Sequence, residues 1–277
     1  MTDKDYGNLY WRLESSCPLR CVMCSSDHLI RTIKGYENTL LDQAKEIGFK
    51  TIVFTGGEPT LREGLPYLLR QAGLKGFMTR LDTNGVYLNG TQVALIKPYL
   101  TMLGLPLHGS TAEAHDLVVG KKGHFNAIKC IADSSTRRGL SLKITTAVTK
   151  ENISDVKNIA DYLNHSIHPE IYGVNALVKR NCNPQAYQKL KIEEEEFENL
   201  KEELLSQNYP FKLSFCFGHK DSDMAYIFVN PDFTISVTAG DSEHIIGDLK
   251  NERLEKILSK VKINHELHMR RFEETNI

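Results

Sequence analysis

The sequence lacks a second pair of closely spaced cysteines. Three of its six cysteines stand within eight residues, at Cys17, Cys21 and Cys24, in the spacing C-x3-C-x2-C. The other three are scattered along the chain, at Cys130, Cys182 and Cys216. Scattered cysteines do not indicate a disulfide framework. A single cysteine group also does not match a zinc ribbon, which pairs two C-x2-C turns.

The sequence also lacks an excess of charge and any long apolar run. Its formal net charge is −1, which provides no field to attract a nucleic-acid polymer or an anionic membrane surface. No apolar run approaches the ~20 residues that a membrane-spanning helix needs, and residues 1–8 contain no apolar signal core. We therefore expect neither nucleic acid nor a membrane as a partner. A reducing cytoplasmic location is expected, because it suits free thiols.

The grouped cysteines carry the strongest chemical signal. Thiolates on so short a loop can converge on one metal centre. A [4Fe–4S] cluster normally takes four cysteines, so three would leave one iron open to a substrate or cofactor. Zinc held by three cysteines and a histidine is the alternative, because Asp27-His28 follows closely.

Short apolar segments rich in β-branched residues alternate with segments of helical spacing. Six strands are expected, at 9–13, 51–55, 77–82, 102–107, 140–148 and 171–177. The helices expected between them lie at 40–47, 65–72, 93–96, 125–138 and 153–163. This order predicts an α/β fold of parallel βαβ units, either a barrel or an open sheet. Catalytic residues should then lie in the loops that follow the strands.

Short polar motifs stand directly after these expected strands. They are the cysteine loop, Gly56-Gly57-Glu58-Pro59, Asp82-Thr83-Asn84-Gly85 and Leu107-His108-Gly109, followed by His115-Asp116 and Gly123-His124-Phe125. In order and spacing they resemble the radical S-adenosylmethionine (SAM) enzymes, in the branch related to the molybdopterin cyclase and to SPASM/twitch enzymes. The resemblance implies a partial (β/α)6 barrel, and it covers roughly residues 9–150.

The resemblance also implies the cofactors and the reaction. Cys17, Cys21 and Cys24 would ligate one [4Fe–4S] cluster, and SAM would bind the open iron. Reductive cleavage of SAM would give methionine and a 5′-deoxyadenosyl radical, which abstracts hydrogen from a small metabolite or a peptide. The electron would come from a donor such as flavodoxin or ferredoxin.

Four residues after the second strand are implied SAM-binding residues. Gly56 and Gly57 would let backbone groups approach the methionyl ammonium closely, and Glu58 would accept a hydrogen bond from that ammonium. Pro59 would fix the turn. A glycine pair alone is more often only a turn, so this assignment depends on the resemblance.

Further contacts with SAM are implied elsewhere. Asn84 would bind the carboxylate or ribose, although an Asn-Gly pair is also a turn signal. Thr145 is a candidate polar contact, although a threonine in a strand is more often structural. Met23 stands where the family usually has an aromatic residue against adenine, and it remains an apolar contact.

Histidines are the remaining candidates for catalysis. His108 replaces the aspartate of the family's LDG motif, and it is a candidate catalytic residue that would bind substrate or move a proton. Its alternative is a hydrogen-bonded loop residue. His115 is expected to cap locally with Asp116, and His265 and His268 are expected on a solvated helix face.

The pattern changes after residue 177. A charged helix is expected at 192–205, a hairpin at 225–229 and 234–237, and a helix at 254–261. We expect a core domain at 1–185 and a twitch-like extension at 186–277. The extension resembles SPASM/twitch tails but lacks their cysteines, so only one cluster is expected.

Two alternatives to the leading function stay open. One is a viperin-like radical SAM enzyme that acts on a nucleoside triphosphate, and the lysine pair Lys121-Lys122 gives it mild support. The other is a non-catalytic zinc or Fe–S binding module. Only eight residues precede the first expected strand, which favours a small substrate, or a leader peptide recognised by another protein.

Overall fold

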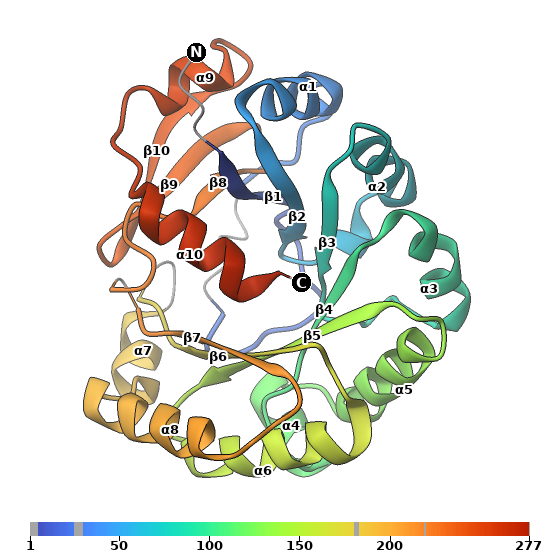
Figure 1. Cartoon of the computed structure of the whole chain (residues 1–277), viewed down its shortest axis with the longest axis vertical. Helices are drawn as coiled ribbons and strands as arrows, with labels where there is room; N and C mark the ends of the chain where they lie inside the picture. Colours follow the sequence, from blue (N-terminus) through green and yellow to red (C-terminus); the bar gives the residue numbers. More distant parts are fainter. Residues whose placement is uncertain (1–4, 25–29, 180–182, 219, 277) are drawn as a thin grey trace.

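The fold is a single curved sheet whose strands are mostly parallel. The computed structural model describes residues 5–24, 30–179, 183–218 and 220–276. Within these residues, parallel pairing joins β1 (Tyr6–Glu14), β2 (Phe49–Gly56), β3 (Met78–Asp82), β4 (Met102–Pro106), β5 (Ser141–Val148), β6 (Ile171–Ala176) and β7 (Lys212–Cys216). The sheet curves around a central space to form a partial barrel (Figure 1).

Three further strands extend the sheet beyond β1. They are β8 (Ile227–Val229), β9 (Thr234–Ala239) and β10 (Ser242–Asp248). β8 pairs parallel to β1, whereas β9 and β10 continue as an antiparallel meander, and the complete order is β10-β9-β8-β1-β2-β3-β4-β5-β6-β7. The expected partial barrel with a C-terminal extension is confirmed. The division at 185/186 stays a prediction, and β7, which lies beyond it, pairs with β6 in the same sheet.

Helices cover the outside of the sheet (Figure 1). They are α1 (Glu37–Ile47), α2 (Leu65–Leu74), α3 (Gly90–Ile96), α4 (Ala112–Val119), α5 (His124–Thr136), α6 (Val156–Tyr162), α7 (Pro184–Leu190), α8 (Glu194–Ser206) and α9 (Leu254–Leu258). No helix of the described residues combines the length and the apolar character needed to cross a bilayer.

Side-chain alternation separates an apolar outer face of the sheet from a polar inner face. On β5, Leu142, Ile144 and Val148 belong to the main core, which also contains apolar residues of α1, α2, α3, α5, α6 and α8. Lys143 and Thr145 point the other way, toward the space above Gly173 of β6. This period of two follows from strand geometry, and it places polar side chains inside the barrel.

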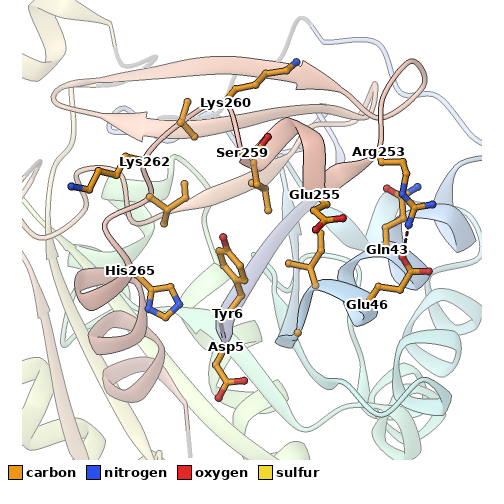
Figure 2. A pocket seen from close by; sticks show the side chains of 15 residues that line it. Asp5, Tyr6, Gln43, Glu46, Arg253, Glu255, Ser259, Lys260, Lys262 and His265 are labelled. Carbon is orange, nitrogen blue, oxygen red and sulfur yellow. Dashed lines mark hydrogen bonds and ion pairs between the residues drawn. The ribbon is translucent and has the colours of Figure 1, made fainter. Parts of the chain in front are cut away.

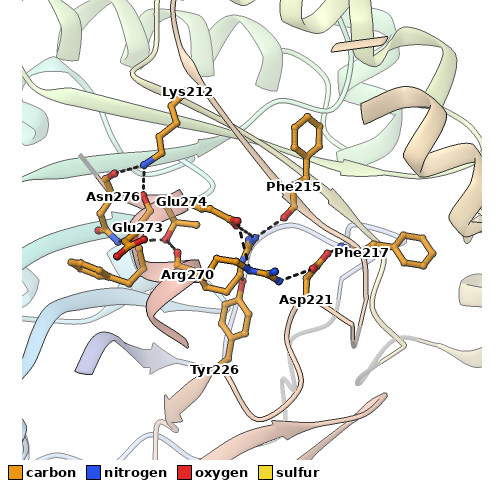
Figure 3. A network of polar contacts seen from close by, with 12 residues as sticks. Lys212, Phe215, Phe217, Asp221, Tyr226, Arg270, Glu273, Glu274 and Asn276 are labelled. Carbon is orange, nitrogen blue, oxygen red and sulfur yellow. Dashed lines mark hydrogen bonds and ion pairs between the residues drawn. The ribbon is translucent and has the colours of Figure 1, made fainter. Parts of the chain in front are cut away.

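A last helix fills the opening of the barrel. α10 (His265–Thr275) packs against β1 and β7, and the helix ends near the centre of the barrel (Figure 1). The Arg271 guanidinium donates to the carbonyl of Phe215 on β7 at 2.5 Å, and Lys212 donates to the carbonyl of Asn276 at 3.3 Å. Figure 3 shows this network between α10 and β7.

The position of α10 overturns one prediction from the sequence. His268 was expected on a solvated face, but its side chain is only 2% exposed. Its Nε2 accepts from the Gly7 N–H at 2.9 Å, and its Nδ1 donates to the Ala225 carbonyl at 2.6 Å. The prediction was wrong for His268 because a polar helix that packs inside a polar barrel can bury a histidine whose two ring nitrogens both find hydrogen-bond partners.

A cavity of about 1250 Å³ opens at the end of the barrel where the strands begin. It lies between α1, α9 and the start of α10 (Figure 2), and Tyr6, Gln43, Arg253 and His265 are among its lining residues. The cysteine loop follows the opposite end of β1. The site residues predicted from the sequence therefore lie at the other end of the barrel, away from this cavity.

Candidate active site

The cysteine loop starts where β1 ends, and a neighbouring loop holds it. The Cys24 N–H donates to the Cys21 carbonyl at 3.0 Å, which closes a turn, and the three thiols are partly buried. The Asn84 side-chain amide donates to Cys17 Sγ at 3.3 Å. The motif after β3 is thereby placed against the first cysteine.

The three thiols influence one another's protonation. Burial, followed by the neighbouring Cys24 and Cys17 thiols, raises the pKa of Cys21 to about 12. Burial also raises the pKa of Cys17, while hydrogen bonds from the Leu19 backbone and the Asn84 side chain lower it. As thiolates these groups repel each other, and a bound cation would remove this repulsion.

The glycine pair after β2 holds the start of the cysteine loop. A Cβ on Gly56 would lie 2.3 Å from the Glu14 carbonyl oxygen, and one on Gly57 would lie 2.3 Å from that of Ser15. The Gly57 N–H donates to the Glu14 carbonyl at 2.7 Å, and the Glu58 N–H donates to the Ser16 carbonyl at 2.9 Å. Only glycine permits this backbone contact.

Glu58 links the motif after β2 to the motif after β3. Its carboxylate is fully buried and accepts from the backbone and hydroxyl of Thr60. It also accepts from the Thr83 hydroxyl at 2.5 Å and from the Asn84 N–H at 2.8 Å. Pro59 is buried and begins the short 3-10 helix Pro59–Leu61. Contact between Glu58 and a SAM ammonium stays a prediction.

A chain of buried histidines reaches the same loop from α4 and α5. The His108 N–H donates to Nδ1 of His115 at 2.9 Å, and Nε2 of His115 lies 2.7 Å from Nδ1 of His124. Nε2 of His124 lies 2.7 Å from the Asn84 carbonyl oxygen. Since Nδ1 of His115 accepts, its Nε2 must donate, and Nε2 of His124 then donates to Asn84.

The histidine chain requires neutral imidazoles. Burial, with the other histidines as a smaller cause, lowers the pKa of His108 to about 4 and that of His115 to about 3. Burial also lowers the pKa of His124. His115 was expected to cap locally with Asp116. Asp116 does accept from the N–H groups of Gly123 and Phe125 at the start of α5, but Nδ1 of His115 accepts from the His108 N–H instead.

Comparison with known proteins identifies the family. The model of the Radical SAM superfamily matches residues 15–163, a segment that runs from the cysteine loop through α6. The chain belongs to the radical SAM superfamily. Enzymes of this superfamily use a [4Fe–4S] cluster and SAM, so the alternative of a non-catalytic binding module is set aside.

Radical SAM relatives with different named activities share this sequence pattern. The chain is 27% identical over 192 residues to the Fe-coproporphyrin III synthase of Methanosarcina barkeri, a match that covers 66% of this chain and 47% of that protein. It is 28% identical over 235 residues to an S-adenosylmethionine-dependent nucleotide dehydratase of Flammeovirga pacifica, a match that covers 80% and 79%. The chain thus spans less than half the length of the first relative.

A solved structure shares the radical SAM fold over nearly the whole chain. SuiB of Streptococcus suis bound to S-adenosylmethionine superposes with a TM-score of 0.72 at 14% identity. The superposition covers 96% of this chain and 68% of SuiB. The likeness therefore extends beyond the family match into the C-terminal strands and helices.

The assignment of the three thiols to one [4Fe–4S] cluster stays a prediction. Among the described residues, no three His, Cys, Asp or Glu side chains form a group that could hold a metal ion. A [4Fe–4S] cluster instead takes each thiolate on a different iron. Cys130 lies exposed on α5, and Cys216 is buried on β7. His28 and Cys182 lie outside the described residues.

The remaining predicted residues surround this loop edge. Met23 is buried in a small apolar cluster with Leu177 and Leu190. His108 is buried, and its Nδ1 accepts from the Ala147 N–H at 3.2 Å, which favours the hydrogen-bonded alternative over a proton acceptor. Thr145 lies farther inside, with its hydroxyl next to Gly173. The roles of all three in binding or catalysis stay predictions.

Sequence reasoning missed several residues that organise this site. Thr83 counted only as part of a motif, yet its hydroxyl donates to Glu58 and accepts from the Gly85 N–H. His124 was also considered only as part of a motif, yet its imidazole links His115 to the Asn84 carbonyl. Lys143 was not singled out, although a lysine that shares a strand face with Thr145 was a visible signal.

Proposed function

We propose that Cys17, Cys21 and Cys24 hold one [4Fe–4S] cluster and that the chain cleaves SAM reductively. When bound, the cluster and SAM supply a 5′-deoxyadenosyl radical that abstracts hydrogen from a small metabolite or a peptide. The observation that carries this proposal is the Asn84 contact with Cys17, which joins the cysteine loop to the buried Glu58 network.

The chain's own residues position the cysteines and the binding loops. Gly57 and Glu58 fix the start of the cysteine loop through backbone hydrogen bonds. Glu58 and His124 fix Asn84 at its N–H and its carbonyl, so that its side chain is presented to Cys17. Such fixed groups around a reactive centre keep a radical aligned with one hydrogen of the substrate.

The barrel interior is the proposed substrate chamber. Its inner face carries charged and hydroxyl side chains from β1, β3, β5 and β7 beneath the loop edge. An electron donor such as flavodoxin or ferredoxin would reduce the cluster.

Anaerobic reconstitution tests the proposal. The wild-type protein is expected to contain iron and sulfide, to absorb in the visible range, and to release 5′-deoxyadenosine from SAM when reduced with dithionite. Cys21→Ala should lose both the cluster and 5′-deoxyadenosine formation, whereas Cys130→Ala, on the exposed side of α5, should keep both. Retained radical formation in Cys21→Ala would refute the proposal.

A nucleoside triphosphate is the second candidate substrate. The nucleotide dehydratase of Flammeovirga pacifica supports it, because that match extends over 79% of the relative's length and 80% of this chain. Nucleoside triphosphates should then raise the rate of 5′-deoxyadenosine release and yield a modified nucleotide detectable by mass spectrometry. An unchanged rate with all common ribonucleotides would leave the small metabolite or peptide as the substrate.

A further inference from the structure

Among the described residues, the arginines on the inner face of the barrel are paired with carboxylates, whereas Lys143 is not. Arg12 pairs with Glu243 at 2.6 Å, Arg80 with Asp82 at 3.0 Å, and Arg271 with Glu274. Lys143 is 7% exposed, and among the described residues its Nζ has neither a hydrogen bond nor an ion pair. It is the buried cation of the inner face that has no partner in the described part of the chain.

The position of Lys143 follows from two glycines on the strands beside β5. Asp82, Gly104 and Lys143 lie side by side across β3, β4 and β5. A Cβ on Gly104 would lie 2.2 Å from the Asp82 carboxylate, so Asp82 occupies the space above β4. The Lys143 side chain crosses β6 instead, with Cε 3.3 Å from the position of a Gly173 Cβ.

Asp82 does not act as the counter-ion of Lys143. Both of its carboxylate oxygens contact the Arg80 guanidinium: Oδ1 lies 3.0 Å from Nε, and Oδ2 accepts from Nη2 at 3.1 Å. Burial, and then the charge of Arg80, lowers the pKa of Lys143 well below its usual range, and Arg271 lowers it further, while Asp82 and Cys216 oppose this. Burial and the two guanidinium groups disfavour the charged form of Lys143, and a bound anion would favour it.

Two hydroxyl groups flank the same space. Thr145, Gly173 and Ser214 lie side by side across β5, β6 and β7, and the Thr145 hydroxyl lies 3.3 Å from the position of a Gly173 Cβ. Ser214 is 1% exposed, and its hydroxyl is buried without a hydrogen-bond partner among the described residues. The Lys143 side chain and the Thr145 hydroxyl thus lie against Gly173, and Ser214 is its neighbour on β7.

We propose that Lys143, with Thr145 and Ser214, binds a carboxylate or phosphate group of the ligand in the barrel. This inference rests on the proposed function, because it names the class of group that the substrate carries into the same chamber. Lys143 supplies the charge, and the hydroxyls supply hydrogen bonds beside Gly173, where any side chain would press against Lys143 and Thr145. The substrate is accordingly an anion, oriented by this group toward the loop edge.

Titration calorimetry on the anaerobically reconstituted full chain tests the inference. The probes are succinate, for a carboxylate, and tripolyphosphate, for a phosphate. The wild type should bind one of them saturably, and Lys143→Gln should bind it about tenfold to a hundredfold more weakly, because a charge-assisted contact is lost. Lys143→Arg should retain most of the affinity, and Thr145→Val should show a smaller loss.

Matched variants and a SAM titration distinguish a substrate anion from the carboxylate of SAM. Lys129→Gln, at an exposed lysine of α5, should bind the probe as the wild type does, and circular dichroism must show that each variant is folded. No saturable binding by the wild type, or equal binding by Lys143→Gln, would overturn the inference. A loss of affinity for SAM alone in Lys143→Gln would also overturn the inference, because the bound anion would then be the carboxylate of SAM. Release of 5′-deoxyadenosine by the wild type tests the proposed function separately.

Discussion

The two ends of the barrel are held together by different kinds of contact. At the loop edge, motifs of a few residues bind one another through backbone groups, the Glu58 carboxylate and the imidazole chain. At the opposite end, α10 fills the opening, and long side chains join it to β7: Arg271 of α10 donates to the Phe215 carbonyl, and Lys212 of β7 donates to the Asn276 carbonyl (Figure 3). Changes at the loop edge should therefore alter the cluster, whereas changes in α10 should alter stability alone.

The largest effect is expected from Gly57→Ala. Its new Cβ would meet the carbonyl oxygens of Ser15 and Ser16 at 2.3 and 2.5 Å, and these backbone atoms cannot move without moving the cysteine loop. We expect a loss of about 3 kcal/mol in the free energy of unfolding, measured by urea denaturation, together with a lower iron content after reconstitution.

Gly73→Ala is the matched control, because Gly73 lies in α2 and a Cβ there would meet no atom within 4 Å. It should leave the iron content unchanged and stabilise the helix by up to about 1 kcal/mol. Equal iron content in both variants would show that the glycine pair does not position the cysteines.

The same difference between the two ends explains what could be predicted from the sequence. The strands β1 to β6 and the polar loops after them were predictable, because hydrophobic periodicity and short motifs are local signals. Asn84 and Cys17 were both predicted for the site, because each belongs to such a motif. Their direct contact was not, because it depends on the fold.

The end with α10 could not be predicted in the same way. Asn8 and Thr275 are hydrogen-bonded across a sequence separation of 267 residues, and no local pattern records such a contact. His268 was assigned to solvent because α10 looks polar on every side, yet its polar groups find partners inside the barrel. The interior pairing of Arg80 with Asp82, which leaves Lys143 unpaired among the described residues, was equally hidden.

The histidine chain predicts a loss of stability in mild acid. His108 and His115 have folded-state pKa values of about 4 and about 3, below the ordinary value of 6.5. The unfolded chain therefore binds more protons below pH 6.5, and stability falls as the pH drops from 6.5 toward 4. We expect the free energy of unfolding to fall by about 2 kcal/mol or more between pH 7 and pH 5.

Two variants test whether the buried histidines cause this pH dependence. In urea denaturation, His115→Phe should flatten the dependence while lowering stability at neutral pH, whereas His165→Gln, an exposed histidine after α6, should keep the wild-type slope. A wild-type slope in His115→Phe would mean that other groups cause the acid sensitivity.

At the opposite end, Arg271→Met should reduce stability by about 2 kcal/mol, because Arg271 is buried and its loss leaves the Phe215 carbonyl and the Tyr226 hydroxyl without their donor. Arg270→Met, on the exposed side of the same helix, should change stability by less than about 0.5 kcal/mol. Both variants should bind iron as the wild type does. A cluster defect in folded Arg271→Met would mean that the two ends are coupled.

The smallest effect, and the opposite sign, is expected from Lys143→Met. Removing an unpaired buried ammonium should stabilise the ligand-free protein by about 1 kcal/mol near neutral pH. Because the pKa of Lys143 is lowered on folding, the unfolded chain binds more protons between the folded-state pKa and the ordinary value of 10.5. The penalty therefore shrinks as the pH rises through this window, and thermal unfolding of both proteins at pH 7 and pH 10 should show a smaller difference at pH 10. If Lys143→Met were less stable than the wild type at pH 7, the ammonium would have a partner inside the folded chain, and it would not be available to bind an anion.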